Sequence, residues 1–423
     1  MPDFPRVTIV NDASVARGGA TGLALMQARM LALRGVPTTF FAADSLGNEA
    51  LRSLGVRVIN VGSDPLMKAP PWKAATRGLY NPAVRQALAR LIADEDTPDT
   101  VYHVHSWSKT LTPSVFSALR PVAARSFIHA HDFFLACPNG GFMDYRAGLP
   151  CTRVPLSVDC LTTNCDKRSM AQKGWRVTRQ AVLRRTLPRS APWAGVLMIH
   201  PGMAPYLRMS GYPEGVLHPL RNPATPISTA RIPAEENDRF LFVGRVEAEK
   251  GVEELIAAAA AAKVPLTVVG DGPLREPLAA RHPEVHFTGW MDRDQIRTVA
   301  AGARALVMPS RYPEPFGLVA AEASLSGLPV ILAQSALLAP EIAAKGIGLA
   351  CDTRDPAAFA AAIARLRDLP ADALRDMSLR AHSGEAGLCT TPDEWIDAQI
   401  GLYRAATARP VSASNSRPTS PRA

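Results

Sequence analysis

Two carboxylates and a glycine lie in one short segment of the sequence, directly after an apolar run at 305–308. Glu314 and Glu322 are separated by seven residues, and Pro315 and Gly317 stand between them. Because proline suits the first turn of a helix, we expect the backbone N–H groups that follow Pro315 to be free to face an anion. Carboxylates accept hydrogen bonds from sugar hydroxyls. The segment therefore predicts a site for a ligand that carries both a phosphate and a sugar.

Two cations and a glycine turn come earlier in the same half of the chain. Arg245 and Lys250 follow an apolar strand pattern at 240–243, and together they could neutralise a diphosphate as it leaves. Val269 ends another strand pattern and precedes Gly270-Asp271-Gly272, a tight turn against which a planar base could lie. Alone, each of these features is more often a solvated surface charge or an ordinary turn.

Four histidines end two neighbouring strands predicted in the first half, namely His103, His105, His129 and His131. Histidines at alternate strand positions face one side, so this set could assemble the metal site of a hydrolase. We favour hydrogen-bonded residues that line a cleft, because a metallohydrolase would leave the cations and carboxylates of the second half unexplained. Metal analysis would separate these interpretations.

Four cysteines gather between residues 137 and 165, at Cys137, Cys151, Cys160 and Cys165. Without an export signal they should be reduced, and four thiols suffice for a structural zinc ion or an iron-sulfur cluster. The spacing lacks the paired Cys-x2-Cys of common zinc motifs, so free buried thiols are the alternative. A structural metal and free buried thiols therefore both stay open for these cysteines.

The size and composition of the chain predict two soluble domains. It has 423 residues, 47% hydrophobic and 20% charged, which exceeds what one core usually organises. No apolar run of about 18 residues could cross a bilayer, and the first residues resemble a strand and not a secretory signal. We therefore expect a cytoplasmic protein.

The positive charge of the chain is unevenly spread. The net charge is +9, and residues 167–213 hold nine Lys or Arg and no Asp or Glu. Such a stretch is either an ordinary solvated helix surface or one that favours an anionic membrane surface or a lipid-diphosphate acceptor. The second interpretation predicts a peripheral position on the inner face of the membrane. Nucleic acid is not an expected partner, because the chain shows no recognised binding module.

Short apolar strands alternate with helices in both halves of the chain. Strands are expected at 6–10, 38–42, 56–61, 101–105, 126–131 and 196–199, the last strand of its half, and again at 240–243, 266–269, 285–287 and 305–308. This alternation predicts an α/β protein with two parallel, doubly wound, Rossmann-like sheets. Ligands of such sheets bind at the carboxyl ends of the strands.

These patterns also predict where the domains begin and end. We expect a first domain at 1–220 with a Cys-rich and basic insertion at 137–190, a linker at 221–238, a donor domain at 239–390, a helix at 391–408 that packs back on the first domain, and a disordered tail at 409–423.

The motifs of the second half resemble those of a known enzyme family when they are taken in order. They are Gly244-Arg245 with Lys250-Gly251, the run 269–273, Phe287-Thr288-Gly289 and the Glu-x7-Glu element at 314–322. In order and spacing they resemble the retaining nucleotide-sugar glycosyltransferases of family four, and the resemblance covers residues 1 to about 403. It implies the GT-B fold, in which two Rossmann-like domains face a central cleft. It also implies transfer of a sugar from a nucleotide-diphosphate donor to a glycan or lipid-linked acceptor with retention of configuration.

The resemblance assigns roles to individual residues. It implies a catalytic set of His131, Glu314, Arg245 and Lys250, in which the two cations hold the donor diphosphate and Glu314 contacts the donor sugar. It implies a donor-binding set of Gly18, Gly19, Gly244, Gly270, Asp271, Gly272, Phe316, Gly317, Leu318, Val319 and Glu322, the last on the ribose hydroxyls.

In such enzymes the leaving phosphate oxygen is thought to take the acceptor proton, so positioning and charge stabilisation suffice and no catalytic cofactor is required. Surface polysaccharide or glycolipid assembly is the usual setting. A nucleotide-sugar epimerase of the same fold and a nucleotide-sugar-binding protein without turnover remain alternatives. The sugar and the base, whether of UDP, GDP or ADP, are not determined by these residues.

Overall fold

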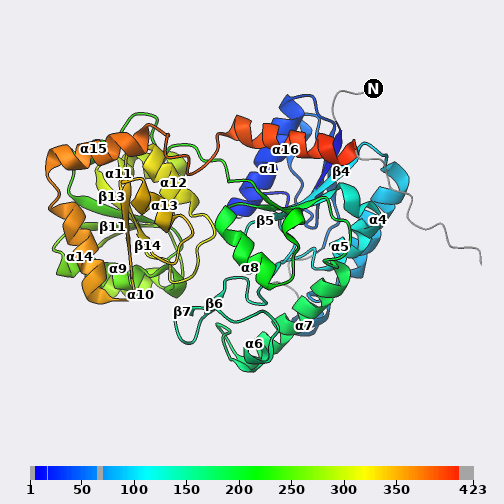
Figure 1. The fold of residues 1–423 in the computed structure, drawn as a ribbon, viewed down its shortest axis with the longest axis horizontal. Helices are drawn as coiled ribbons and strands as arrows, with labels where there is room; N and C mark the ends of the chain where they lie inside the picture. Colours follow the sequence, from blue (N-terminus) through cyan, green and yellow to red (C-terminus); the bar gives the residue numbers. More distant parts are fainter. Residues whose placement is uncertain (1–4, 17, 64–69, 409–423) are drawn as a thin grey trace, which may run out of the picture.

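The computed structural model describes residues 5–16, 18–63 and 70–408. The tail predicted at 409–423 lies outside the described residues. Figure 1 shows two units, each a sheet with helices packed on it. The prediction of two doubly wound parallel sheets is confirmed.

The first sheet has seven parallel strands in the order β3-β2-β1-β4-β5-β8-β9. They are β1 (Arg6–Asn11), β2 (Thr38–Ala42), β3 (Arg57–Asn60), β4 (Thr100–Val104), β5 (Ser126–Ala130), β8 (Gly195–Met198) and β9 (Leu217–Pro219). The expected last strand at 196–199 is therefore not the last, because β9 pairs with it along Leu217, His218 and Pro219. A strand of three residues that contains His and Pro gives no apolar run that a sequence pattern could detect.

Helices cover both faces of this sheet, and their bounds are α1 (Gly19–Leu33), α2 (Glu49–Arg52), α3 (Pro71–Arg77), α4 (Pro82–Glu95), α5 (Ser114–Leu119), α7 (Met170–Thr186) and α8 (Ala204–Met209). The chain between β5 and α7 forms an insertion that holds a small hairpin, β6 (Met143–Asp144) with β7 (Leu149–Pro150), and the short helix α6 (Val158–Thr162). Helix α7 begins where the Ser169 hydroxyl accepts a hydrogen bond from the Gln172 N–H at 3.2 Å, a typical N-cap.

The second sheet has six parallel strands in the order β12-β11-β10-β13-β14-β15. They are β10 (Arg239–Val243), β11 (Leu266–Val269), β12 (His286–Gly289), β13 (Ala303–Met308), β14 (Val330–Ala333) and β15 (Gly348–Cys351). The helices are α9 (Val252–Ala261), α10 (Arg275–Arg281), α11 (Arg293–Ala300), α12 (Leu318–Leu325), α13 (Ala339–Ala344), α14 (Pro356–Arg367) and α15 (Ala371–His382). The direction of winding reverses between β10 and β13, which is where such sheets bind ligands.

The last helix, α16 (Pro392–Thr407), returns from the second unit to the first. In Figure 1 this red helix lies beside the blue helix α1. Trp395 and Tyr403 of α16 are fully buried in the core of the first sheet, together with Ile9 and Phe40. Within the part of the chain that the structure describes, no helix is both long and apolar enough to cross a membrane.

Candidate functional site

A cavity of about 580 Å³ lies between the two domains, and every segment that lines it follows a strand or begins a helix. From the first domain it is lined by Asp12, by the start of α1 from Gly18, by the residues after β4 from His105 to Lys109, and by His131 and Asp132 after β5. From the second domain it is lined by Arg245 and the run 314–318. The structure thus brings together the carboxyl edges of both sheets.

Glu314 is held by three partners at the wall of this cavity. Its Oε2 accepts hydrogen bonds from Lys250 Nζ at 2.7 Å and from Ser310 Oγ at 2.9 Å, and Lys250 Nζ also lies 2.7 Å from the Tyr312 hydroxyl. Burial alone would raise the pKa of Glu314, but Lys250 and the hydrogen bonds of Tyr312 and Ser310 hold it below the usual value. Glu314 is therefore a carboxylate, and the charge of Lys250 is already met by it.

Arg245 is the more accessible of the two predicted cations. Its side chain is 66% exposed, it lines the cavity, and its Nη1 donates to Glu247 Oε1 at 2.6 Å. An exposed pair of this kind contributes little to stability and is readily exchanged for another anion. Arg245 can therefore turn to a diphosphate, whereas Lys250 is fixed beside Glu314.

Helix α12 begins at Leu318, so the expectation that Pro315 lies in its first turn is wrong. Gly317 precedes the helix in the left-handed region, with φ 76°, and a Cβ on it would lie 2.7 Å from Met308 Cε. This conformation is costly for other residues and delays the helix start. The Ala320 N–H is the first of this helix to donate within the turn, to Gly317 O. Among the described residues, the N–H groups at 317–319 therefore have no backbone partner.

Phe316 contributes to packing as well as to the cavity wall. It is 3% exposed and belongs to a core cluster made otherwise mostly of first-domain residues such as Phe133 and Met203. Across the cavity, a Cβ on Gly19 would lie 3.5 Å from Leu318 Cδ1. The two predicted glycine-containing loops therefore face each other directly.

Several predicted site residues do not line this cavity, namely Gly244, Lys250, Gly270, Asp271, Gly272, Val319 and Glu322. Glu322 pairs with Arg293 at 3.2 Å, and burial raises its pKa against the influence of that arginine. A Cβ on Gly270 would lie 1.8 Å from Gly244 O. The glycine turn is thus required for the close approach of two loops, whether or not a ligand is bound there.

His131 is the one of the four predicted histidines that is not fully buried, and it lines the cavity. Its Nε2 lies 2.9 Å from Nδ1 of His105, and burial lowers the pKa of His131 to about 3. The imidazole is therefore neutral at neutral pH, so it acts as a hydrogen-bonding group more readily than as a charged acid.

The other three histidines form a buried cluster behind His131. His103, His105 and His129 are at most 2% exposed, and one nitrogen of each lies within 4.8 Å of the others, so they could hold a metal ion. Their nitrogens are largely engaged: His103 Nε2 lies 3.2 Å from His129 Nδ1, and His105 Nε2 lies 2.6 Å from Gln27 Oε1. A catalytic metal keeps an open position for water. Because His105 and His129 line the cavity, the cluster has such access, while the hydrogen bonds between its rings and to Gln27 are those of cleft-lining residues.

Sequence reasoning missed three polar groups at this site. Asp12 accepts hydrogen bonds from the N–H groups of Lys109, Thr110 and Leu111, which fixes the loop after β4. Lys109 lines the cavity as a first-domain cation. Tyr312 supports Lys250. Asp12 directly follows the first strand, and that position was the signal available for it.

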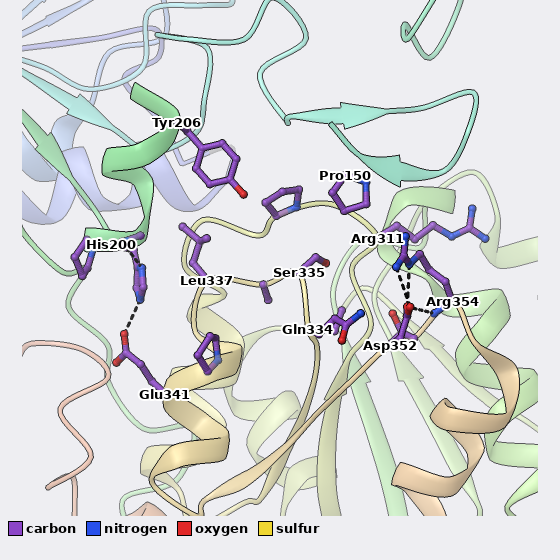
Figure 2. A pocket seen from close by; sticks show the side chains of 17 residues that line it. Pro150, His200, Tyr206, Arg311, Gln334, Ser335, Leu337, Glu341, Asp352 and Arg354 are labelled. Atoms are coloured by element: carbon purple, nitrogen blue, oxygen red, sulfur yellow. Dashed lines mark hydrogen bonds and ion pairs between the residues drawn. The ribbon is translucent and has the colours of Figure 1, made fainter. Parts of the chain in front are cut away.

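A second cavity, of about 660 Å³, lies on the other side of the 311–313 segment and is shown in Figure 2. Figure 2 shows His200 pointing to Glu341, at 2.9 Å, and Arg354 pairing with Asp352. Glu341 also accepts from Arg221 at 2.7 Å. Glu341 of the second domain thus contacts His200 and Arg221 from across the domain boundary, so this cavity has the character of a joint between domains.

The chain is similar to known proteins. Residues 227–383, which form most of the second domain, match the model of the family Glycosyl transferases group 1. A glycogen synthase of Mycobacterium tuberculosis is 36% identical over 157 residues, which cover 34% of this chain and 38% of that protein. The chain thus spans less than half the length of this curated relative.

Solved structures resemble the chain over nearly its whole length. The sucrose-phosphate synthase of Thermosynechococcus elongatus superposes with a TM-score of 0.69 at 20% identity, covering 95% of this chain and 98% of that one. HepE of Anabaena, in complex with UDP and glucose, superposes with a TM-score of 0.64 at 16% identity, covering 95% and 99%. Such identities show the fold alone. The chain has the GT-B fold, as the sequence predicted.

Proposed function

We propose that the protein is a retaining glycosyltransferase that moves a sugar from a nucleotide-diphosphate donor to a glycan or lipid-linked acceptor. One observation carries this proposal: a single cavity is lined by Arg245, Glu314 and the free N–H groups near Gly317 from one domain, and by His131 and the Gly18-Gly19 loop from the other. The family match of the second domain supports it.

The groups of the second domain suit a departing diphosphate. Arg245 can exchange its contact with Glu247 for a phosphate, and the N–H groups of Leu318 and Val319 can donate to the same anion. Glu314, held ionised by Lys250, accepts hydrogen bonds from sugar hydroxyls. We assign Glu322 to the ribose hydroxyls.

The proposed reaction breaks the bond between the anomeric carbon and the phosphate oxygen, and forms a bond from that carbon to an acceptor oxygen on the same face. The leaving phosphate oxygen takes the acceptor proton. The chain then supplies orientation and charge stabilisation, so the step requires no cofactor. Neutral His131 orients the transferred sugar by hydrogen bonding.

The acceptor and the location of the protein are part of the same proposal. We place the protein in the cytoplasm, in peripheral contact with an anionic membrane surface, and in surface polysaccharide or glycolipid assembly. The contact would use basic residues of 167–190 that remain exposed, such as Arg168 and Arg185. Several others are engaged within the molecule: Lys167 pairs with Glu249 and Arg176 with Asp166. The available positive surface is therefore smaller than the sequence suggested.

A donor panel tests the proposal. UDP, GDP and ADP, followed by their sugars, are screened by thermal shift, because a ligand at about a hundred times its dissociation constant stabilises a protein by about 2.7 kcal/mol. UDP is the first choice, since HepE, which shares the fold, was solved with it. We expect nucleoside diphosphate to be released only when an acceptor is present. Release without acceptor, or conversion of the sugar alone, would instead support the epimerase or a hydrolase.

A further inference from the structure

Lys173 of α7 is buried among sulfur atoms. Its side chain is 1% exposed, and its Nζ lies 2.8 Å from Cys165 Sγ and 3.7 Å from Cys160 Sγ. The shorter contact is a hydrogen bond in which the lysine nitrogen donates to the Cys165 sulfur. The amine and the thiol sulfur are therefore direct neighbours.

Two neighbouring cations of the insertion, unlike Lys173, pair with carboxylates. Lys167 pairs with Glu249 at 2.8 Å, and Arg153 pairs with Asp144 at 3.2 Å. Among the described residues, the partners of Lys173 Nζ are the two sulfurs and no carboxylate oxygen. A buried ammonium without a carboxylate is costly, so Lys173 depends on these sulfurs for its polar contacts.

Both reacting atoms are held in place by the surrounding fold. The Lys173 N–H donates to Ser169 O in the first turn of α7, at 3.0 Å. The Cys165 carbonyl accepts from the Tyr145 N–H at 3.2 Å and from Asn139 Nδ2 at 3.0 Å, and Asn139 Nδ2 also lies 3.2 Å from the Cys165 sulfur. The close approach is therefore built from two sides, and little motion is needed to bond the two atoms.

We propose that Lys173 and Cys165 form an oxidative cross-link in which a single oxygen atom bridges the lysine nitrogen and the cysteine sulfur. With dioxygen as the oxidant, the thiol, the amine and one O2 give the bridged N–O–S product and one water molecule. Sulfur and nitrogen each lose two electrons, and dioxygen takes up all four. Two of the three hydrogens on the thiol and amine leave in the water, and one stays on the bridging nitrogen. A thiol reductant reverses the link, because sulfur that is less oxidised than sulfinic acid can be reduced back to the thiol.

The cross-link would stiffen one wall of the interdomain cavity. Helix α7 also carries Gln180, whose amide donates to the carbonyls of Leu135 and Ala136, and Arg179, whose guanidinium lies over the Phe134 ring. Phe134 and Leu135 line the cavity. Joining α7 to the insertion therefore links the redox state of Cys165 to the rigidity of that wall, independently of which reaction the cavity performs.

Mass spectrometry of the full-length protein tests the proposal. After exposure to air or dilute hydrogen peroxide, the intact chain should gain one oxygen atom and lose two hydrogen atoms, and dithiothreitol should reverse the change. Trypsin should then release residues 154–167 joined to residues 169–176, because it does not cleave after a modified Lys173. Separate peptides from the oxidised protein would overturn the cross-link.

Variants identify the two atoms involved. Lys173→Met and Cys165→Ala should each abolish the mass change, whereas Cys160→Ala and the matched control Cys389→Ala should retain it. Circular dichroism confirms folding of each variant, and Cys165→Ala keeps the test valid if Lys173→Met does not fold. A disulfide between Cys160 and Cys165 that forms equally in Lys173→Met would overturn the proposal.

Elemental analysis tests the alternative that these cysteines hold a metal ion. In the described chain the three histidines are the only potential ligands found within 4.8 Å of one another in a set of three, so the cysteine metal site stays a prediction from the sequence. Stoichiometric zinc or iron that is lost in both Cys137→Ala and Cys151→Ala would place the four thiolates on a metal and overturn the cross-link. Metal-free protein that forms the bridge would support it.

Discussion

The two walls of the interdomain cavity are built from different chemistry. The second domain supplies ionised groups held in pairs, Lys250 with Glu314 and Arg245 with Glu247. The first domain supplies His131 and the histidines behind it, whose pKa values burial holds well below the usual 6.5. We call the second-domain side the charged wall and the first-domain side the neutral wall, after its imidazoles, although Asp12, Lys109 and Asp132 also line the latter. Both stand at the carboxyl edge of a parallel sheet.

This difference divides the work between the domains. A diphosphate needs cations and backbone donors, and these come from the second domain, which is also the part that matches the family model. A sugar hydroxyl needs fixed, uncharged hydrogen-bonding groups, and the imidazole stack offers these, with ring centroids of His129 and His131 4.4 Å apart. The comparison predicts that donor binding at the charged wall is sensitive to charge removal and to salt. The stability that the histidines of the neutral wall contribute should be sensitive to acid.

The largest effect is expected from Glu314→Gln. The change keeps the shape of the side chain but removes the carboxylate that Lys250 and Ser310 hold in place. We expect turnover to fall roughly 100- to 1,000-fold, as for the loss of one preorganised polar group in other sites. Steady-state rates measure this, with the exposed Glu253→Gln as the control. Activity near that of the wild type would show that the Glu314 carboxylate is not needed for turnover.

Acid should destabilise the protein through the neutral wall. Because the folded-state pKa values of His103, His105 and His129 are depressed, the stability they contribute is complete above about pH 6.5 and is lost as the pH falls. Each can add a slope of up to about 1.4 kcal/mol per pH unit below that value. Asp132, whose pKa burial raises to about 6, opposes part of this loss.

Urea unfolding between pH 7.5 and pH 4.5 measures the acid effect. We expect the free energy of unfolding to decrease towards low pH with a slope greater than that of one titrating group. A free energy of unfolding that is constant or rises towards acid would contradict this prediction. It would show that these histidines take up protons in the folded protein as readily as in the unfolded one, as solvated groups do.

The sequence predicted which residues would come together better than it predicted their contacts. Arg245, Lys250 and Glu314 could be singled out because each stands just after a strand pattern, and strand ends meet at one edge of a parallel sheet. That Lys250 is neutralised by Glu314 could not be predicted, since their pairing depends on how the segment after β13 lies against the one after β10. Spacing along the chain does not record that distance.

Other differences have equally local causes. The start of α12 was placed too early because Pro315 favours a helix start, while Gly317 is in the left-handed region and postpones it. The buried position of Phe316 among first-domain residues required the arrangement of two domains. The parallel, doubly wound arrangement of both sheets, in contrast, followed directly from strands that alternate with helices.

Arg245→Ala should have an intermediate effect, on donor binding. Hydrogen bonds to charged groups are worth about 1.5–3 kcal/mol, so donor affinity should fall roughly 10- to 100-fold and depend less on salt than in the wild type. Glu322→Gln should weaken donor affinity less, because Glu322 lies outside the cavity lining and is paired with Arg293. Calorimetry with nucleoside diphosphate at two salt concentrations measures both. Unchanged donor affinity in Arg245→Ala would show that Arg245 is a solvated surface charge and does not bind the donor.

The smallest effect is expected from His131→Ala, on the neutral wall. Because burial lowers the pKa of His131 to about 3, the side chain contributes a neutral hydrogen bond, worth about 0.5–1.5 kcal/mol, and turnover should fall roughly two- to tenfold. Donor affinity should change less, since the diphosphate is bound by the other domain. Separate measurement of kcat and of the donor dissociation constant checks this, with the exposed His286→Ala as control. A loss of affinity as large as that of Arg245→Ala would show that both walls bind the donor, and the division between them would fail.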